Sequence, residues 1–166
     1  MTRVFVTVGT TSFDALIQAV DTPEVYATLK KLGYDEVVTQ IGRGEYEPRN
    51  GVNSGLTTSF YRFNPEYKAD IRRASLVLSH AGAGSIMDTL VERKALIVIP
   101  NNKLMDNHQE ELAVALAKRQ HLIQTTCDGL AACLESMDLT RLVPYPEIDE
   151  DLFPAFVDNM MGLKTA

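Results

Sequence analysis

Short apolar runs of strand length alternate along this chain with stretches that carry a helical pattern. The clearest strand-like runs cover residues 4–8, 76–79 and 95–99, and apolar residues recur at helical spacing over residues 107–119. Strands that are apolar on both sides and are separated by helices are typical of a parallel sheet buried on both faces. The sequence therefore predicts an α/β fold with helices on both faces of a parallel sheet.

The remaining elements fit the same alternation. Further strands are expected at residues 36–41, 57–62 and 121–125, and helices at residues 13–17, 23–32, 65–74, 86–92 and 129–137. Thr11, Ser12 or Asp14 is expected to cap the first helix, because its side-chain oxygen can accept hydrogen bonds from the first free amides. Residues 42–56 are rich in Gly, Asn, Pro and charge and are predicted to form a loop.

Length and composition exclude several classes of protein. The 166 residues suit one domain with a single buried core. The net charge is −6, with sixteen basic residues among twenty-two acidic ones, which argues against nucleic acid as a partner. Every apolar run is shorter than the roughly 18–20 residues of a membrane span. No signal peptide is expected before the first strand, so we predict a soluble, cytoplasmic chain.

Metal chemistry is not expected either. Cys127 and Cys133 lack the CxxC spacing and are predicted to be reduced. His80, His108 and His121 do not have zinc spacing, and no HExxH or GxSxG motif is present. The sequence predicts no metal site and no cofactor.

Two glycine turns lie where predicted strands end, and ligands of parallel sheets bind beyond the carboxyl ends of the strands. The first turn, Gly9-Thr10-Thr11-Ser12, could bring backbone amides and hydroxyls to phosphate oxygens, or could be an ordinary strand-to-helix turn.

The second turn, His80-Ala81-Gly82-Ala83-Gly84-Ser85, precedes a predicted helix and could cradle a diphosphate. It is not the full dinucleotide fingerprint, because Met87 stands where GxGxxG needs glycine. His80 could donate to a phosphate, or could be a satisfied structural histidine.

Polar residues beside these turns are candidates for sugar recognition. Asp88 follows Ser85 by one helical turn, and its carboxylate could accept both ribose hydroxyls or could be a solvated helix residue. Residues 101–109 are dense in hydrogen-bonding side chains, which suits a hexose. In the same segment Asp106 or Asn107 could cap the following helix.

Four segments taken together resemble glycosyltransferase family 28, in its C-terminal, donor-binding domain. They are VTVGTTSFD (6–14), QIGRG (40–44), SHAGAGSIMDTL (79–90) and LMDNHQ (104–109). The resemblance implies the Rossmann-like, donor-binding half of a GT-B glycosyltransferase, with residues 1–143 as the nucleotide-sugar domain. Residues 144–166 are then a linker and a C-terminal helix that could dock a partner or pack on the chain's own sheet.

The resemblance also implies a substrate and a set of site residues. The donor is UDP-N-acetylglucosamine, and the reaction adds the second N-acetylglucosamine to dolichol-diphosphate-N-acetylglucosamine in N-glycan precursor synthesis. The glycine turns approach the diphosphate, Asp88 takes the ribose, and His108 and Gln109 face the sugar. The implied donor-binding residues are Gly9, Thr10, Thr11, Ser12, Gly42, His80, Ala81, Gly82, Ala83, Gly84, Ser85, Asp88, Met105, Asn107, His108 and Gln109.

The same resemblance implies an inverting, metal-independent transfer that needs a second polypeptide. A membrane-anchored, acceptor-binding subunit would supply the lipid-diphosphate sugar, and would recruit the chain to the cytosolic face of the endoplasmic reticulum. The catalytic base would come from that partner or from His80, with the partner favoured. Two alternatives stay open: a subunit of a bacterial exopolysaccharide glycosyltransferase that uses another UDP-sugar, and a non-catalytic nucleotide-binding module.

Overall fold

The computed structural model describes residues 2–101 and 107–146, with the backbone alone for residues 107–109. The strands are β1 (Arg3–Thr7), β2 (Glu36–Gln40), β3 (Gly51–Asn53), β4 (Leu56–Tyr61), β5 (Leu76–His80), β6 (Ala95–Ile99) and β7 (Ile123–Gln124). The helices are α1 (Asp14–Val20), α2 (Pro23–Lys31), α3 (Tyr67–Arg73), α4 (Ala83–Val91), α5 (Asn107–Lys118) and α6 (Leu130–Ser136), followed by a short 3-10 turn, η1 (Leu139–Arg141).

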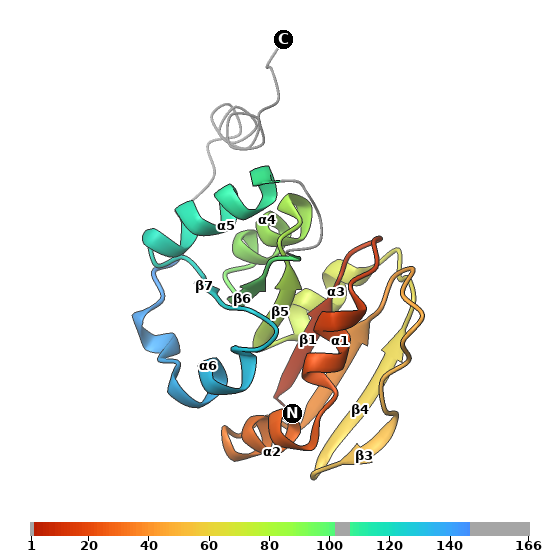
Figure 1. Ribbon diagram of the computed structural model, residues 1–166. Helices are drawn as coiled ribbons and strands as arrows, with labels where there is room; N and C mark the ends of the chain where they lie inside the picture. The colour runs from red at the N-terminus through yellow and green to blue at the C-terminus, as the bar shows by residue number, and fades with distance from the viewer. Residues whose placement is uncertain (1, 102–106, 147–166) are drawn as a thin grey trace.

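The strands form one seven-stranded sheet in the order β3-β4-β2-β1-β5-β6-β7 (Figure 1). All neighbouring pairs from β4 to β7 are parallel. Chain order therefore runs outward in one direction from β1 through β2 to β4, and in the other from β5 through β6 to β7. The reversal between β1 and β5 is the topological switch point at which doubly wound folds bind ligands. The predicted Rossmann-like α/β fold is confirmed.

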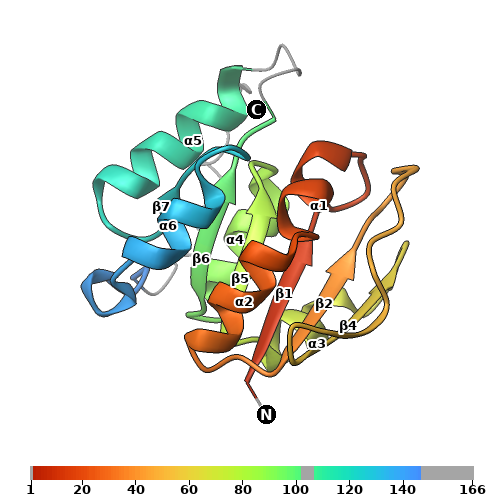
Figure 2. The same ribbon diagram turned by 60° about the horizontal axis from the view of Figure 1, so that its bottom comes forward.

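Both faces of the sheet are covered by helices, as alternate residues of each strand show. Val4 and Val6 belong to a core cluster with α1, α2 and α6, whereas Phe5 between them packs with α3, α4 and α5. Figure 2 shows α1, α2 and α6 in front of the sheet. Strands buried on both sides read as unbroken apolar runs, which is why these strands could be recognised from the sequence.

The region predicted as a loop over residues 42–56 contains a strand. β3 pairs antiparallel with β4, and the two are joined by Ser54 and Gly55 at φ 51° and 83°. A two-residue turn with both φ values positive is the tight hairpin connection that matches the twist of its strands. The sheet is therefore parallel except at this edge, and the prediction of a loop over residues 42–56 was wrong where β3 forms.

Two predicted helix starts also differ from the structure. The N-cap of α1 is Phe13, with no side-chain hydrogen bond, so none of Thr11, Ser12 and Asp14 caps this helix. Asp14 instead accepts from the backbone N–H of Glu45 through Oδ2 at 3.2 Å, which ties α1 to the segment after β2. Helix α4 begins at Ala83 rather than at residue 86, which places Ala83, Gly84 and Ser85 of the second glycine turn inside its first turn.

The helices of the described residues include none that is both long enough and apolar enough to cross a bilayer. The C-terminal helix predicted within residues 144–166 falls beyond residue 146, where the described residues end, and the proposed boundary at residue 144 stays a prediction.

Candidate functional site

A pocket of about 500 Å³ opens at the carboxyl ends of β1 and β5, on the switch point of the sheet. Three segments line it: the turn after β1, the start of α4, and the segment between β4 and α3. The lining residues are Gly9, Thr10, Thr11, Gln40, Phe63, Asn64, Pro65, Tyr67, His80, Gly82, Gly84 and Ser85. A smaller cleft of about 210 Å³ lies at the opposite end of β6, beside Ala95 and Tyr145, and contains no glycine turn.

The turn after β1 is fixed in position by backbone and side-chain hydrogen bonds. Gly9, at φ 65°, donates its N–H to Thr7 Oγ1 at 3.0 Å and accepts from Gln40 Nε2 at 3.0 Å through its carbonyl. Thr11 closes the turn, because its hydroxyl donates to the Val8 carbonyl at 2.9 Å. Gln40 is buried and lines the pocket, so it both holds the turn and forms part of the wall.

The start of α4 brings to the pocket backbone amides that have no hydrogen-bond partner within the helix. Gly82 is the N-cap and no side chain caps the helix. The first helical hydrogen bond runs from the Ile86 N–H to the Gly82 carbonyl at 3.0 Å, so the N–H groups of Ala83, Gly84 and Ser85 precede it. Free amides and the positive end of the helix dipole together form a site suited to phosphate.

The imidazole of His80 lies against Gly9 of the first glycine turn and Gly82 of the second. A Cβ placed on Gly9 would come within 3.0 Å of His80 Cε1, and a Cβ on Gly82 would clash with the same ring. The missing side chains at Gly9 and Gly82 therefore leave room for the imidazole as well as for a ligand. Burial lowers the pKa of His80 from 6.5 to about 4, and a hydrogen bond with the Thr7 backbone opposes this shift.

The lowered pKa of His80 predicts that the folded protein loses stability as the pH falls. The folded state keeps the imidazole neutral, whereas the unfolded chain binds a proton below pH 6.5, so His80 costs stability progressively between pH 6.5 and pH 4. The expected cost at pH 4 is about 3 kcal/mol. Urea unfolding of wild type and of His80→Gln across this range measures it, because the non-titrating variant should show a shallower pH dependence. Parallel curves for the two proteins would contradict the prediction.

The wall formed by residues 63–67 was not singled out in the sequence. Phe63 is 51% exposed and lines the pocket, which leaves its ring available to a planar group. Asn64 lines the pocket too, and its Nδ2 donates to the buried Asp70 at 3.2 Å. Asp70 also accepts from the hydroxyl of Tyr61 and pairs with Arg3, so this wall is anchored to the centre of the sheet. The one feature of the sequence that could have indicated this wall was the aromatic Phe63, which follows the end of β4 in an otherwise polar segment.

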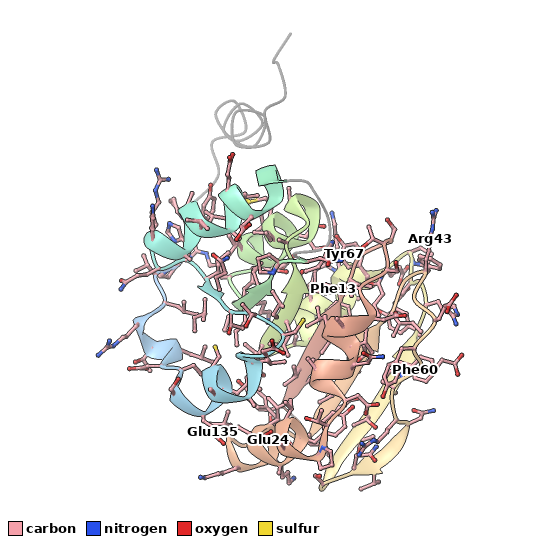
Figure 3. The ribbon with its side chains drawn as sticks, viewed as in Figure 1. Phe13, Glu24, Arg43, Phe60, Tyr67 and Glu135 are labelled. Carbon is pink, nitrogen blue, oxygen red and sulfur yellow. The ribbon has the colours of Figure 1, made fainter. Side chains whose placement is uncertain are left out.

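Asp88 lies beside the pocket rather than among its lining residues. The Tyr67 hydroxyl donates to Asp88 Oδ2, and Lys68 Nζ lies 3.7 Å from Oδ1. Tyr67 itself lines the pocket, and Figure 3 shows it at the same end of the sheet as Arg43 and opposite Glu24 and Glu135. Tyr67 thus connects the lining of the pocket to Asp88.

Other predicted site residues have different positions. Gly42 lies under the first glycine turn, where a Cβ would run into the Thr11 carbonyl oxygen. Ser12 is exposed and Ala81 is buried in the core, and neither is among the lining residues. Ala83 contributes the first residue of α4.

The predicted sugar-binding segment is partly outside the described residues. Met105 lies there, and for Asn107, His108 and Gln109 the backbone alone is described. These three residues form the first turn of α5, which follows the carboxyl end of β6. Among the described side chains, no group of three or more His, Cys, Asp or Glu is placed to hold a metal ion.

The sequence matches the glycosyltransferase family 28 C-terminal domain over residues 3–159. Two similar curated proteins carry the name UDP-N-acetylglucosamine transferase subunit ALG13. The Homo sapiens protein is 49% identical over 127 residues, which cover 76% of this chain and 11% of that protein. The Yarrowia lipolytica protein is 36% identical over 159 residues, which cover 93% of this chain and 81% of that protein. The chain thus spans about a tenth of the length of the human relative.

Solved structures show the same fold. An NMR solution structure of ALG13 has 26% sequence identity and a TM-score of 0.69, and the match covers 96% of this chain and 95% of that one. Acinetobacter baumannii MurG has 18% identity and a TM-score of 0.63 over 84% of this chain and 42% of its own. At this identity, the similarity to MurG concerns the fold alone.

Proposed function

The chain belongs to glycosyltransferase family 28, to its C-terminal domain, and from this premise we propose that it is the donor-binding subunit of a UDP-N-acetylglucosamine transferase. The observation that carries the proposal is the pair of glycine turns at the switch point of the sheet, with the free amides of α4 facing an open pocket. Such a pocket suits the diphosphate of a nucleotide sugar without a cluster of basic side chains.

The pocket's walls suggest how the donor would lie. The diphosphate would meet the amides of Ala83, Gly84 and Ser85 and the turn at Gly9. The uracil would stack on the exposed ring of Phe63. The ribose would then lie toward Asp88, and His108 and Gln109 at the start of α5 would face the sugar.

The proposed transfer is inverting and metal-independent. An acceptor hydroxyl attacks the anomeric carbon on the face opposite the diphosphate, the bond from that carbon to the diphosphate oxygen breaks, and UDP departs. Amides and the helix dipole of α4 stabilise the negative charge that develops on the departing diphosphate.

The proton of the acceptor hydroxyl must go to a base. With a pKa of about 4, the His80 imidazole is a weak base at neutral pH, where a base with a pKa near 7 is most effective. We therefore assign the general base to a partner subunit.

The same partner would bring the acceptor. We propose a membrane-anchored subunit that binds dolichol-diphosphate-N-acetylglucosamine and holds this chain at the cytosolic face of the endoplasmic reticulum. The product would carry the second N-acetylglucosamine of the N-glycan precursor. The names of the relatives, which call each a subunit of a UDP-N-acetylglucosamine transferase, support this assignment.

Calorimetry with UDP-N-acetylglucosamine tests the donor proposal, with UDP and UDP-glucose for comparison. We expect binding to the wild-type chain, with UDP-N-acetylglucosamine bound more tightly than UDP-glucose. Phe63→Ala should weaken UDP binding about tenfold or more, because stacking of a base on an aromatic ring contributes about 1–3 kcal/mol. Inorganic pyrophosphate should bind both proteins equally.

The same preparation addresses the partner. The chain alone should transfer no sugar to a lipid-diphosphate acceptor, and addition of the membrane-anchored subunit should start the reaction. No UDP binding at millimolar concentration would refute the donor proposal, and full activity of the isolated chain would refute the need for a partner. A preference for UDP-glucose or UDP-glucuronate would favour an exopolysaccharide enzyme.

A further inference from the structure

Tyr67 and Asp88 form a hydrogen-bonded pair that joins α3 to α4 at the edge of the pocket. The Tyr67 hydroxyl donates to Asp88 Oδ2. Asp88 keeps about a quarter of its side chain exposed, at 28%, so neither this bond nor the ion pair with Lys68 encloses it. The pair is therefore open to a ligand on one side.

The start of α4 connects this pair to the proposed diphosphate site. Gly84 and Asp88 are four residues apart in the helix and so lie on the same face, one turn from each other. A Cβ on Gly84 would meet no atom within 4 Å. Open space thus lies above the face that leads from the free amides to Asp88, and Tyr67 lines the same pocket.

The chemistry of the pair leaves acceptor positions for a sugar hydroxyl. Burial and the hydrogen bond to Asp88 both raise the pKa of Tyr67, so the phenol stays protonated and donates to the carboxylate. A phenol oxygen that donates its proton can still accept, and a carboxylate offers several further lone pairs. The two side chains together can accept from two neighbouring hydroxyl groups.

We propose that Tyr67 is a ribose-recognition residue, which shares the hydroxyl groups of the bound nucleotide with Asp88. This inference rests on the proposed nucleotide-sugar function. Tyr67 lines the pocket and its hydroxyl donates to Asp88, which is not among the lining residues, so a ribose that approaches Asp88 from the pocket would also contact the Tyr67 hydroxyl.

A structural role alone is the competing explanation, because Tyr67 also packs against the core and helps to join α3 to α4. The same two helices are joined one turn further along by Arg72 and Glu92, whose side chains lie 3.1 Å apart. Tyr67→Phe keeps the packed ring and removes the hydroxyl alone. A loss of nucleotide affinity that depends on a ribose hydroxyl therefore comes from contact between that hydroxyl and Tyr67, and not from changed packing.

The test compares UDP with 2′-deoxy-UDP and 3′-deoxy-UDP on the full chain by calorimetry, in wild type and in Tyr67→Phe. We expect Tyr67→Phe to weaken the binding of UDP about tenfold. The binding of one of the two deoxy analogues should weaken by less than about twofold, because that analogue lacks the hydroxyl that Tyr67 contacts. Tyr46→Phe is the matched control, because the Tyr46 hydroxyl also donates to a buried aspartate, Asp21, at 2.6 Å, and Tyr46 does not line the pocket. It should leave all three affinities unchanged.

The outcomes separate this inference from the proposed function. If Tyr67→Phe bound UDP and both deoxy analogues more weakly by the same factor, or bound all three as wild type does, the role of Tyr67 would be overturned. Binding of UDP to wild type would in that case still support the donor site. Failure of wild type to bind UDP would overturn both.

Discussion

Gly84→Val should remove most of the donor binding and leave the fold at least as stable as before. Gly84 is the second residue of α4, is exposed, and lines the pocket. A Cβ there meets no atom within 4 Å outside its own stretch of helix, so we expect a valine side chain to extend into open space and to occupy the place of the diphosphate. We expect the dissociation constant for UDP-N-acetylglucosamine to rise at least about 100-fold, equivalent to about 2.7 kcal/mol.

The free energy of unfolding should rise slightly in the same variant. Glycine inside a helix is less favourable than valine by about 0.4 kcal/mol, since valine loses less backbone freedom on folding. Urea unfolding and calorimetry on the same preparation measure the two effects separately. Ala132→Val is the control, because it also places a valine at an exposed position of a helix, in α6, away from the pocket. It should leave donor affinity unchanged.

Gly82→Ala gives a contrasting result from the same turn. A methyl group on Gly82 would clash with the His80 ring, so both stability and donor binding should fall.

If Gly84→Val lost stability and affinity in the same proportion, Gly84 would serve the fold and the diphosphate would have to lie elsewhere.

The sequence predicted where the site lies because the apolar runs identified the sheet. Because β1 and β5 are parallel strands, the two glycine turns that follow them must lie at the same edge of the sheet. The pairing of β1 with β5, and hence the switch point between them, depended on the resemblance to a known family. Periodicity does not say which strands are neighbours.

The roles of individual glycines could not be predicted. Gly42 and Gly84 both stand in glycine-rich motifs, and both were expected to bind the donor. What separates them is the set of atoms around the position of a missing Cβ: open space at Gly84 and the Thr11 carbonyl at Gly42. Those atoms come from segments distant in sequence, so no local pattern carries the distinction.

Two further features were missed for different reasons. The hairpin between β3 and β4 had a local signal in Ser54-Gly55, which was overlooked within a polar segment. Tyr67 had no local signal, because its partner Asp88 is twenty-one residues away on another helix. Its place in the pocket follows from the packing of α3 beside α4, which tertiary structure alone supplies.

Gly42→Ala should destabilise the protein strongly and weaken donor binding through the fold. Gly42 has φ 60°, which costs a residue with a side chain about 1 kcal/mol or more. The added methyl group would also meet the Thr11 carbonyl oxygen, a backbone atom that cannot rotate away. We expect the free energy of unfolding to fall by about 2–4 kcal/mol.

The loss of binding should follow from a displaced turn. Thr11 can yield to the methyl group if the segment from Gly9 to Thr11 moves, and that movement would also break the hydrogen bond of 3.0 Å from the Arg43 N–H to the Thr11 carbonyl. Because Gly9 and Thr11 line the pocket, the diphosphate contacts would shift with them. Donor affinity should therefore fall together with stability, unlike in Gly84→Val.

Gly55→Ala separates the clash from the backbone strain. Gly55 also has a positive φ, of 83°, and a Cβ there would meet no atom nearer than 3.5 Å, from the flexible Lys30 side chain. It should lose roughly the 1 kcal/mol of strain and keep wild-type donor affinity, because the β3–β4 hairpin does not line the pocket. If Gly42→Ala were no less stable than Gly55→Ala but still lost the donor, Gly42 would touch the ligand directly. The interpretation of Gly42 as a support beneath the first turn would then be wrong.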